Sequence, residues 1–330
     1  MTVTFDEAVH RIAAADSFPD LLAAIAGAPR DPGLAYKMLV KIVHPDVAPA
    51  GRGSSATAAF ARLSALWAGG GPVLTTKRAS YRLGALVEAG DIANLYALDG
   101  GSALLKLPRR PGDNDLLAAE ALALGTLERD GEAKHRAYAP RLIESFTHED
   151  PATGVRRTAN VLARQRGFVS LAAVAHAYPD GVDPRDAAWM WRRLLVGLGW
   201  AHRAGIVHGA VLPEHVLIHP AQHGLVLIDW CYSVVPGGRI PALVAKHRAD
   251  YPPEVTGKRA ATSATDIYLA TRTMRRLIKT KLPAALGRFA DGCLYDAPRM
   301  RPQDAWRLLA EFDELIDKLF GPRKFRPFTI

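Results

Sequence analysis

The first clear hydrophobic pattern in the chain is helical and lies in "GLAYKMLVKIVHPD". Its apolar residues recur at the spacing i, i+3, i+4 and i+7, which predicts a helix with one apolar stripe. The stripe consists of Tyr36, Leu39, Val40 and Val43. Proline cannot continue a helix, so the helix is expected to end at Pro45. Lys37 and Lys41 lie off the stripe, four residues apart, and form a basic face.

A second helical pattern follows in "ATAAFARLSALWA", with Phe60, Leu63 and Trp67 on one side. The intervening "APAGRGSS" is rich in proline, glycine and serine and predicts a loop. Two antiparallel helices that bury these stripes against each other would leave the HPD tripeptide, residues 44–46, at their tip. Upstream, "TFDEAVHRIAAADSFPDLLAAIAG" predicts two further helical segments.

A longer hydrophobic pattern lies in the second half of the chain. "AAWMWRRLLVGLGWAHRAGIVHG" has the apolar periodicity of a long helix, which Gly205 is expected to end. The segment "IVHGAVLPEHVLIHP", the tight turn "AQHG" and the strand "LVLID" follow and lead to Asp229. Between the two halves, "AGGGPVLTTKRAS" mixes glycines, a proline and small polar residues and predicts a linker or loop.

Composition narrows the class of protein. The chain has 330 residues, a formal net charge of +9 and two cysteines, Cys231 and Cys293. Two cysteines give neither a disulfide framework nor a four-thiolate metal site, which favours a reducing, cytoplasmic compartment. No apolar run has the length of a membrane span and the N-terminus lacks a signal-peptide pattern, so no membrane partner is expected. Nothing resembles a dedicated nucleic-acid fold, and no nucleic-acid partner is expected.

The N-terminal motifs resemble those of the J-domain family. "AYKMLVKIVHPD" is similar to the family's second helix and HPD loop, and "FARLSALW" is similar to its third helix. The resemblance implies that His44, Pro45 and Asp46 dock on a DnaK-type chaperone and trigger its ATP hydrolysis. It also makes Lys37 and Lys41 electrostatic contacts, since a basic rim speeds encounter with an acidic face. The alternative is a chance tripeptide in a helical hairpin.

Residues 81–315 resemble the protein kinase fold along nearly their whole length. "YRLGALVEAGDIANLYAL" is similar to the strands around the glycine-rich loop, with Gly90 at the centre of that loop. "SALLKLPR" is similar to the strand that carries the ATP-contacting lysine, here Lys106. "NDLLAAEALALGTL" is similar to the helix whose glutamate pairs with that lysine, here Glu120. The alternative for Lys106 and Glu120 is a pair of unrelated surface charges.

Downstream motifs supply structural residues of the same fold. "DYPPEV" is similar to the APE element, and "RMRPQDAWRLL" contains the arginine that pairs with it. The resemblance therefore implies a buried ion pair between Glu254 and Arg301. "TSATDIYLATRTM" is similar to the helix whose aspartate, Asp266, braces the catalytic loop, and His208 is expected to support that loop.

The residues that perform phosphoryl transfer in the family are replaced. Ala210 stands where the family has the aspartate that accepts the proton of the substrate hydroxyl. Leu212 replaces a lysine that neutralises the transferred group, and His215 replaces an asparagine that holds a metal ion. In the glycine-rich loop, Glu88 and Ala93 occupy glycine positions. These replacements argue against ordinary phosphorylation.

The residues that are kept serve nucleotide binding. Asp229 retains the metal-binding position of the DFG motif, which here reads Asp229-Trp230-Cys231. Together with Lys106 and Glu120 it forms the set that the resemblance assigns to ATP, with Asp229 as the Mg²⁺ ligand. This is the pattern of a pseudokinase, and no catalytic residue is assigned.

Several residues near this set admit two interpretations. Glu214 is either a displaced general base or a solvent-facing side chain. His215 is either a metal ligand or a packed histidine. Cys231 is either a reactive thiol or a buried one. The tail "FGPRKFRPFTI" is a binding segment or a loosely packed terminus. The structural role is expected in each case.

These patterns predict an α+β protein. A small all-α, J-domain-like helical module precedes a two-lobed protein-kinase-like fold with a β-rich N-lobe and a helical C-lobe. The expected parts are the helical module 1–68, a linker 69–80, the N-lobe 81–160, the C-lobe 161–320 and a basic tail 321–330.

Three functions follow from this organisation. The first expectation is an adaptor that recruits a DnaK-type chaperone through the HPD loop, while the kinase-like region binds an unidentified client and ATP without efficient phosphoryl transfer. The second is an atypical ATP-dependent transferase, a protein kinase or an AMP transferase, on a degraded kinase site. The third is a structural or regulatory module with a vestigial nucleotide site.

Overall fold

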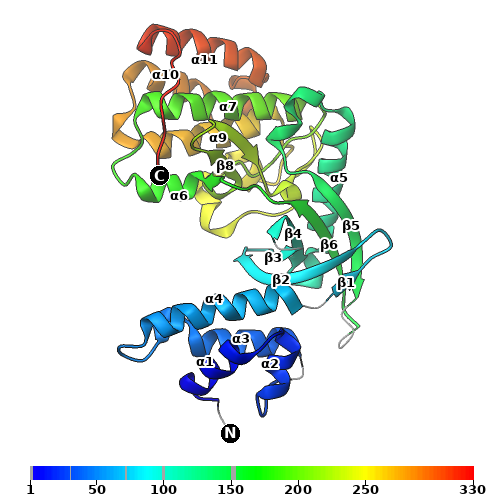
Figure 1. Ribbon diagram of the computed structural model, residues 1–330. Helices are drawn as coiled ribbons and strands as arrows, with labels where there is room; N and C mark the ends of the chain where they lie inside the picture. The colour runs from blue at the N-terminus through cyan, green and yellow to red at the C-terminus, as the bar shows by residue number, and fades with distance from the viewer. Residues whose placement is uncertain (1–2, 30, 71–72, 99–100, 150–153) are drawn as a thin grey trace. The chain divides into compact units, whose positions relative to one another are not determined.

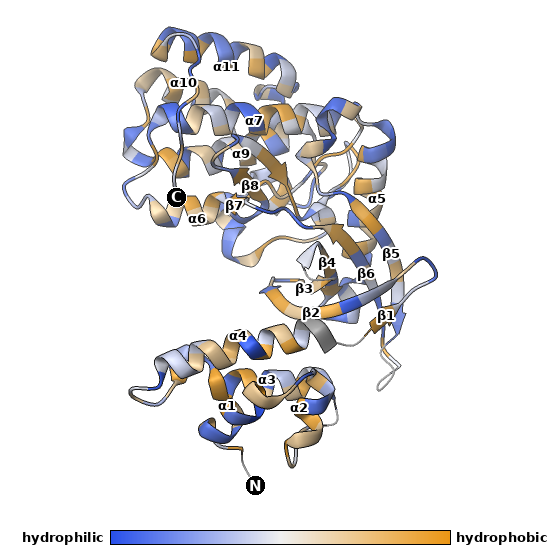
Figure 2. Ribbon diagram, viewed as in Figure 1, coloured by the Kyte–Doolittle hydropathy of each residue, from blue (hydrophilic) through white to orange (hydrophobic). Residues whose placement is uncertain are grey.

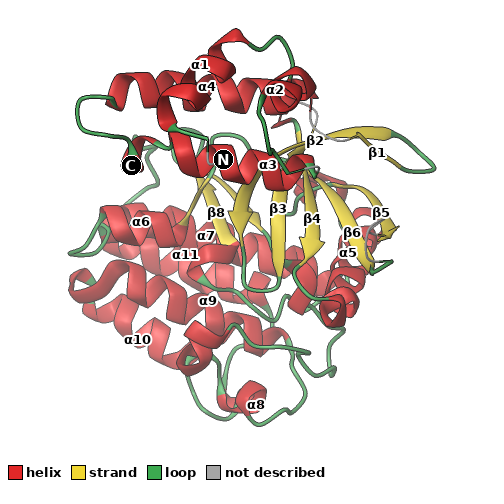
Figure 3. Ribbon diagram, turned by 90° about the horizontal axis from the view of Figure 1, so that it is seen from below, coloured by secondary structure: helices red, strands yellow, loops and turns green. Residues whose placement is uncertain are grey.

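The computed structural model describes residues 3–29, 31–70, 73–98, 101–149 and 154–330. The protein is α+β, with an N-terminal helical module, an antiparallel half-barrel sheet and a mostly helical C-terminal region (Figure 1, Figure 3). The chain divides into two compact units, Met1–Arg109 and Arg110–Ile330. Within the described residues, no helix is long and apolar enough to cross a membrane.

The N-terminal module is helical (Figure 1). Its elements are α1 (Phe5–Ala14), α2 (Phe18–Ala24), α3 (Pro32–Val43), the 3-10 turn η1 (Pro45–Val47) and α4 (Gly53–Gly70). The side chains of Thr4, Ser17 and Asp31 accept hydrogen bonds from first-turn amides of α1, α2 and α3. Such caps satisfy amides that the start of a helix leaves unpaired. The prediction of two helical segments upstream of α3 is confirmed.

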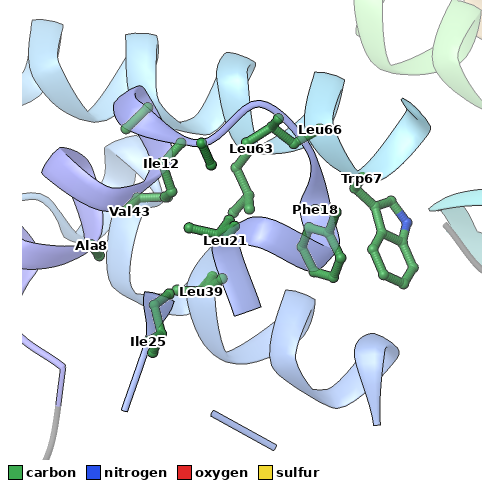
Figure 4. Packing of buried hydrophobic residues seen from close by; sticks show 12 residues of the cluster. Ala8, Ile12, Phe18, Leu21, Ile25, Leu39, Val43, Leu63, Leu66 and Trp67 are labelled. Atoms are coloured by element: carbon green, nitrogen blue, oxygen red, sulfur yellow. The ribbon is translucent and has the colours of Figure 1, made fainter. Parts of the chain in front are cut away.

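One hydrophobic core joins these helices (Figure 4). Phe18 of α2 packs edge-on against Trp67 of α4 with ring centroids 4.8 Å apart, and Tyr36 of α3 stacks on the same indole at 4.6 Å. Leu39 and Leu63 are fully buried in the same cluster. Each buried side chain of this size contributes roughly 1.5–3 kcal/mol. The predicted packing of the two apolar stripes is confirmed.

Antiparallel strands complete the first unit. They are β1 (Val73–Thr75), β2 (Ser80–Ala89), β3 (Ala93–Leu98) and β4 (Ala103–Pro108), which pair in chain order. Ala85 of β2 packs against the core of the helical module.

The segment 69–80, expected as a linker, contains the end of α4 and all of β1, while its residues 71–72 lie outside the described residues. In β1, Leu74 pairs with Tyr81 of β2. Apolar and β-branched residues such as Val73 and Thr75 suit a strand once a partner is present. This pairing gives regular structure to a segment whose glycines suggested a loop.

The second unit begins with a helix and a pair of strands. Its first elements are η3 (Pro111–Asp113), α5 (Asn114–Asp130), η4 (Ala133–Tyr138), β5 (Leu142–Glu149) and β6 (Arg156–Ala163), and β5 and β6 pair antiparallel. The amide nitrogen of Asn114 donates to the Arg156 carbonyl at 3.1 Å, and its side-chain oxygen accepts from the Thr158 amide at 2.8 Å. These bonds fix the start of α5 to β6.

The rest of the second unit is mostly helical. Its helices are α6 (Leu171–Ala177), α7 (Pro184–Arg203), α8 (Pro253–Thr256), α9 (Ser263–Ile278), α10 (Ala284–Cys293) and α11 (Ala305–Phe320). A small antiparallel sheet contains β7 (Val169–Ser170), β8 (Val216–His219) and β9 (Gly224–Leu227). The residues of β8 are mostly apolar, whereas α11 has both hydrophilic and hydrophobic residues, as expected for an amphipathic helix (Figure 2). Trp191 of α7 packs against Phe312 of α11 with ring centroids 5.3 Å apart.

Short 3-10 turns connect the elements of this region. They are η5 (Pro213–His215), η6 (Trp230–Tyr232), η7 (Ala245–Asp250), η8 (Lys279–Lys281) and η9 (Pro298–Met300). Gly205 follows α7 with a φ of 77°, a left-handed conformation that suits glycine after a helix. The predicted long helix, its end near Gly205 and the hairpin that follows it are confirmed.

The C-terminal segment after α11 is docked. Phe328 is buried and stacks on Tyr178 with ring centroids 5.5 Å apart, and the Tyr178 hydroxyl donates to the Thr329 carbonyl at 2.6 Å. The guanidinium of Arg326 lies 3.5 Å from the carboxylate of Asp183. An aromatic anchor and polar contacts from distant elements hold this segment, although most of its residues are exposed.

Candidate functional site

The HPD tripeptide lies in the connection between α3 and α4. Helix α3 ends at Val43, and Pro45 opens the turn η1 because its ring prevents a further helical turn. Nδ1 of His44 accepts a hydrogen bond from the Asp46 amide at 3.2 Å. The same ring packs edge-on against Phe60 of α4, with centroids 5.3 Å apart. These contacts fix the backbone of the loop and anchor it to α4.

The surface around this loop is exposed and basic. The side chain of Asp46 is 86% exposed and that of His44 is 40% exposed. Lys37 and Lys41 are exposed on α3, and Leu34, three and seven residues before them, is 58% exposed on the same face. The HPD surface is the set of Leu34, Lys37, Lys41 and residues 44–47. It combines a carboxylate, two lysines and apolar area around a fixed turn.

The glycine-rich loop and the predicted ATP-contacting lysine also lie in the first unit. The amide of Gly90 donates to the Ala93 carbonyl at 2.9 Å and closes the turn between β2 and β3. A Cβ atom at Gly90 would lie 2.9 Å from that same oxygen, so the turn requires glycine. Lys106 is buried on β4 and pairs in register with Leu95 of β3. Glu88 is exposed at the end of β2.

In the second unit, Asp266 of α9 holds the loop that follows α7. Its carboxylate accepts hydrogen bonds from the amides of His208 at 2.7 Å and Gly209 at 2.8 Å. Nε2 of His202 lies 2.9 Å from the same carboxylate. Asp266 is fully buried, and a buried carboxylate requires partners of this kind. It therefore fixes the backbone that leads into Ala210.

His208 is buried beneath this loop and links it to the end of β9. Burial lowers the pKa of His208 to about 4, so the ring is neutral near pH 7. Its Nε2 donates to the Ile228 carbonyl at 2.9 Å, and its Nδ1 accepts from the Ala210 amide at 3.3 Å. The ring also packs against Trp230, with centroids 4.5 Å apart. These contacts give His208 a supporting role in the loop.

His215 connects the loop to Asp229. Its Nδ1 lies 2.8 Å from the Ala210 carbonyl oxygen, and its Nε2 lies 3.2 Å from Oδ2 of Asp229. The ring is stacked with Tyr232 at 5.8 Å between centroids. The side chains of Ala210 and Leu212 are both buried. Neither of these two positions offers a proton acceptor or a positive charge.

The donors around Asp229 are chemically mixed. One ligand atom from each of Glu120, Asp229 and Cys231 lies within 4.8 Å of the other two. The imidazole of His215 is adjacent to Asp229, so oxygen, sulfur and nitrogen atoms meet here. Magnesium prefers oxygen ligands in octahedral geometry. These residues do not fit the magnesium site that the sequence predicts at Asp229.

Glu214 is engaged by neighbouring side chains. Its carboxylate lies 2.9 Å from Nζ of Lys246 and 2.8 Å from Nε2 of His247. Burial opposes ionisation of Glu214, but the hydrogen bond from Lys246 and other favourable contacts outweigh it, and the pKa is lowered. A carboxylate with a lowered pKa is a weak proton acceptor near pH 7. This favours a structural role for Glu214 over that of a displaced base.

Glu254 and Arg301 form a buried, bidentate ion pair. Nη1 of Arg301 donates to Oε1 of Glu254 at 2.7 Å, and Nη2 donates to Oε2 at 3.0 Å. The hydroxyl of Thr265 donates to Oε1 at 3.0 Å, and the guanidinium lies 4.6 Å from the ring centroid of Tyr268. The pair that the kinase resemblance implies is therefore formed, and it ties α8 and α9 to the segment before α11.

No protein-family model matches the chain, and no curated protein matches it. Of the predicted nucleotide set, the structure brings Glu120 and Asp229 together in the second unit. It places Gly90 in the turn between β2 and β3 and Lys106 on β4, both in the first unit. The HPD surface lies on the helical module of the first unit.

Three polar contacts in this region were missed by the sequence analysis. The amide of Asn160 on β6 donates to Oε2 of Glu120 at 3.0 Å and to the Leu117 carbonyl at 2.9 Å. Nδ1 of His247 lies 2.9 Å from Oδ2 of Asp250, which belongs to η7. An asparagine inside the apolar run "NVLA" and the histidine–aspartate spacing of three residues were the available signals.

Proposed function

We propose that this protein is an adaptor. Its N-terminal helical module is J-domain-like and recruits a DnaK-type chaperone through the HPD surface. The remainder of the chain is a kinase-like region that acts as a pseudokinase: it binds a client protein, and ATP is a conformational ligand that is not turned over.

The main support for this proposal is that the HPD loop has a fixed backbone and exposed charged groups. His44 fixes the turn through the Asp46 amide and the ring of Phe60, whereas the Asp46 carboxylate, 3.6 Å from Nδ1 of His44, is 86% exposed. A tripeptide that only closed a hairpin would have no need of an exposed carboxylate beside exposed Lys37 and Lys41. An exposed, preorganised set of charged groups is typical of a protein–protein contact.

The second unit supports a kinase-like region without transfer chemistry. Asp266 holds the loop and Glu254 pairs with Arg301, which are the structural features of that resemblance. At the centre of the loop, however, Ala210 supplies only a buried methyl group. Loss of a general base costs about two to four orders of magnitude in rate.

Charge reversal on the HPD surface tests recruitment. The Lys37→Glu/Lys41→Glu variant is compared with Lys77→Glu/Arg78→Glu, which reverses two exposed charges elsewhere in the same unit. We expect the first variant to bind an ATP-loaded DnaK-type chaperone at least about tenfold more weakly by surface plasmon resonance, with a difference that shrinks at high salt. Equal affinity of both variants, or no binding by the unaltered protein, contradicts the proposal.

A transferase is the second candidate, because Glu120 and Asp229 are retained and lie together. Incubation with ATP labelled at the α or the γ position, beside an Asp229→Ala control, separates the candidates. The adaptor proposal predicts no label on protein from either position. Label from γ-ATP would indicate a protein kinase, and label from α-ATP an AMP transferase. ATP is expected to raise the melting temperature, since a ligand stabilises the state that binds it; no rise favours a vestigial nucleotide site.

A further inference from the structure

A cavity of about 660 Å³ lies in the second unit, lined by α7, α11 and the C-terminal segment. Its apolar lining includes Ala188, Trp189, Phe312, Ile316 and Phe320. A volume of this size suits a small organic molecule. The lining includes none of the residues of the HPD surface or of the cluster around Asp229.

The polar lining of the cavity is strongly basic. It contains Arg185, Arg192, Arg193, Arg323, Lys324 and Arg326, against the single carboxylate of Asp313. Nε of Arg192 lies 2.9 Å from Asp313 and Arg326 pairs with Asp183, so these charges are compensated. Arg323 and Lys324 are exposed, and in the part of the chain that the structure describes no ion pair is formed by either. The rim therefore carries positive charge that an anion would neutralise.

One wall of the cavity is a preorganised aromatic stack. The rings of Trp189 and His223 lie parallel, with centroids 4.0 Å apart and 5° between their planes. His223 adopts a left-handed backbone conformation with a φ of 51°, which a non-glycine residue takes up only where its surroundings hold it. Among the described residues, the buried indole N–H of Trp189 has no hydrogen-bond partner. This N–H is inaccessible to solvent, so the partly exposed rings of Trp189 and His223, and not this donor, form the wall of the cavity.

We propose that this cavity binds a small organic anion that has an apolar body and a carboxylate or phosphate head. The apolar body would lie on the partly exposed rings of Trp189 and Phe320, and the head would pair with Arg323 and Lys324. The proposal is independent of the adaptor function. Because the C-terminal segment contributes one wall, the ligand would also hold that segment on α7 and α11.

The first test is a titration of the full-length protein with 8-anilino-1-naphthalenesulfonate, an aromatic anion that fluoresces when it leaves water. Saturable binding is expected for the unaltered protein. Arg323→Gln/Lys324→Gln is expected to weaken it by about tenfold. The matched control, Lys258→Gln/Arg259→Gln, removes two exposed charges outside the cavity and is expected to bind as before. Absence of saturable binding, or equal binding by both variants, would overturn the proposal.

Competition identifies the head and the body of the ligand. Dodecanoate and dodecyl phosphate are expected to displace the fluorescent anion, and the stronger of the two shows which head is preferred. Dodecanol, which lacks the charge, and inorganic phosphate, which lacks the apolar body, are expected to compete at least tenfold more weakly. If dodecanol or inorganic phosphate competes as well as dodecanoate, the proposed ligand chemistry is wrong.

Discussion

His215 places its Nε2 3.2 Å from Oδ2 of Asp229. Its Nδ1 lies 2.8 Å from the Ala210 carbonyl, which can only accept, so Nδ1 carries a proton. The imidazole of His215 therefore contacts the carboxylate that the sequence assigns to a metal ion.

Replacement of His215 by asparagine is expected to make the protein respond to magnesium. The amide supplies an oxygen ligand and frees the Asp229 carboxylate, and Mg²⁺ prefers oxygen atoms. The melting temperature of His215→Asn should rise on addition of millimolar magnesium chloride, whereas that of the unaltered protein should change little. His10→Asn, at an exposed histidine of the helical module, serves as the control. An equal rise in all three proteins would show that His215 does not exclude the metal.

Removal of one partner from the Glu254–Arg301 pair is expected to be costly. Glu254→Gln leaves a buried guanidinium without its counter-charge, which typically lowers the free energy of unfolding by about 3–5 kcal/mol. Glu311→Gln breaks an exposed pair in which the carboxylate lies 3.5 Å from Nε of Arg307, and such pairs contribute at most about 1 kcal/mol. Urea denaturation followed by tryptophan fluorescence measures both. Similar losses in the two variants would mean that Glu254 and Arg301 do not form a stabilising pair.

His208 should make the protein sensitive to mild acid. Burial lowers its pKa to about 4, whereas in the unfolded chain histidine binds a proton below about pH 6.5. The unfolded state therefore holds more protons between these values, and stability is lost as the pH falls from 6.5 toward 4. The loss from this residue is at most about 3 kcal/mol.

The free energy of unfolding, measured across this pH range, checks the prediction. His208→Gln keeps a neutral donor for the Ile228 carbonyl. It should reduce the dependence of the free energy of unfolding on pH, although other groups still titrate. His10→Gln, which replaces an exposed histidine, should leave the slope unchanged. A slope that persists in His208→Gln would assign the acid sensitivity to other groups.

Local patterns predicted the helices well and the short extended segments poorly. The stripe through Leu39 and the end of α7 before Gly205 depend on spacing and backbone preference, which the sequence displays directly. Strand β1 depends on pairing across a turn, where Leu74 meets Tyr81. The C-terminal segment depends on Phe328 reaching Tyr178, 150 residues away in the chain. Contacts of that kind leave no periodic signal.

Contacts within the candidate site could be predicted from the sequence only where both residues belong to a recognisable motif. The APE-like and arginine motifs predicted the contact of Glu254 with Arg301, which the structure contains. The hydrogen bond from Asn160 to Glu120 and the contact of His247 with Glu214 join elements far apart in the chain. No pattern within either segment specifies its partner, so these contacts required the fold.

Stimulation of ATP hydrolysis by a DnaK-type chaperone, measured in single turnover, tests the adaptor function most directly. We expect the full-length protein to accelerate hydrolysis and His44→Gln to abolish the acceleration, because the substitution removes the ring that contacts Phe60 and accepts from the Asp46 amide. His10→Gln, an exposed histidine in the same module, should accelerate hydrolysis as the unaltered protein does. Acceleration by His44→Gln equal to that of the unaltered protein, or none by the unaltered protein, would contradict recruitment through the HPD surface.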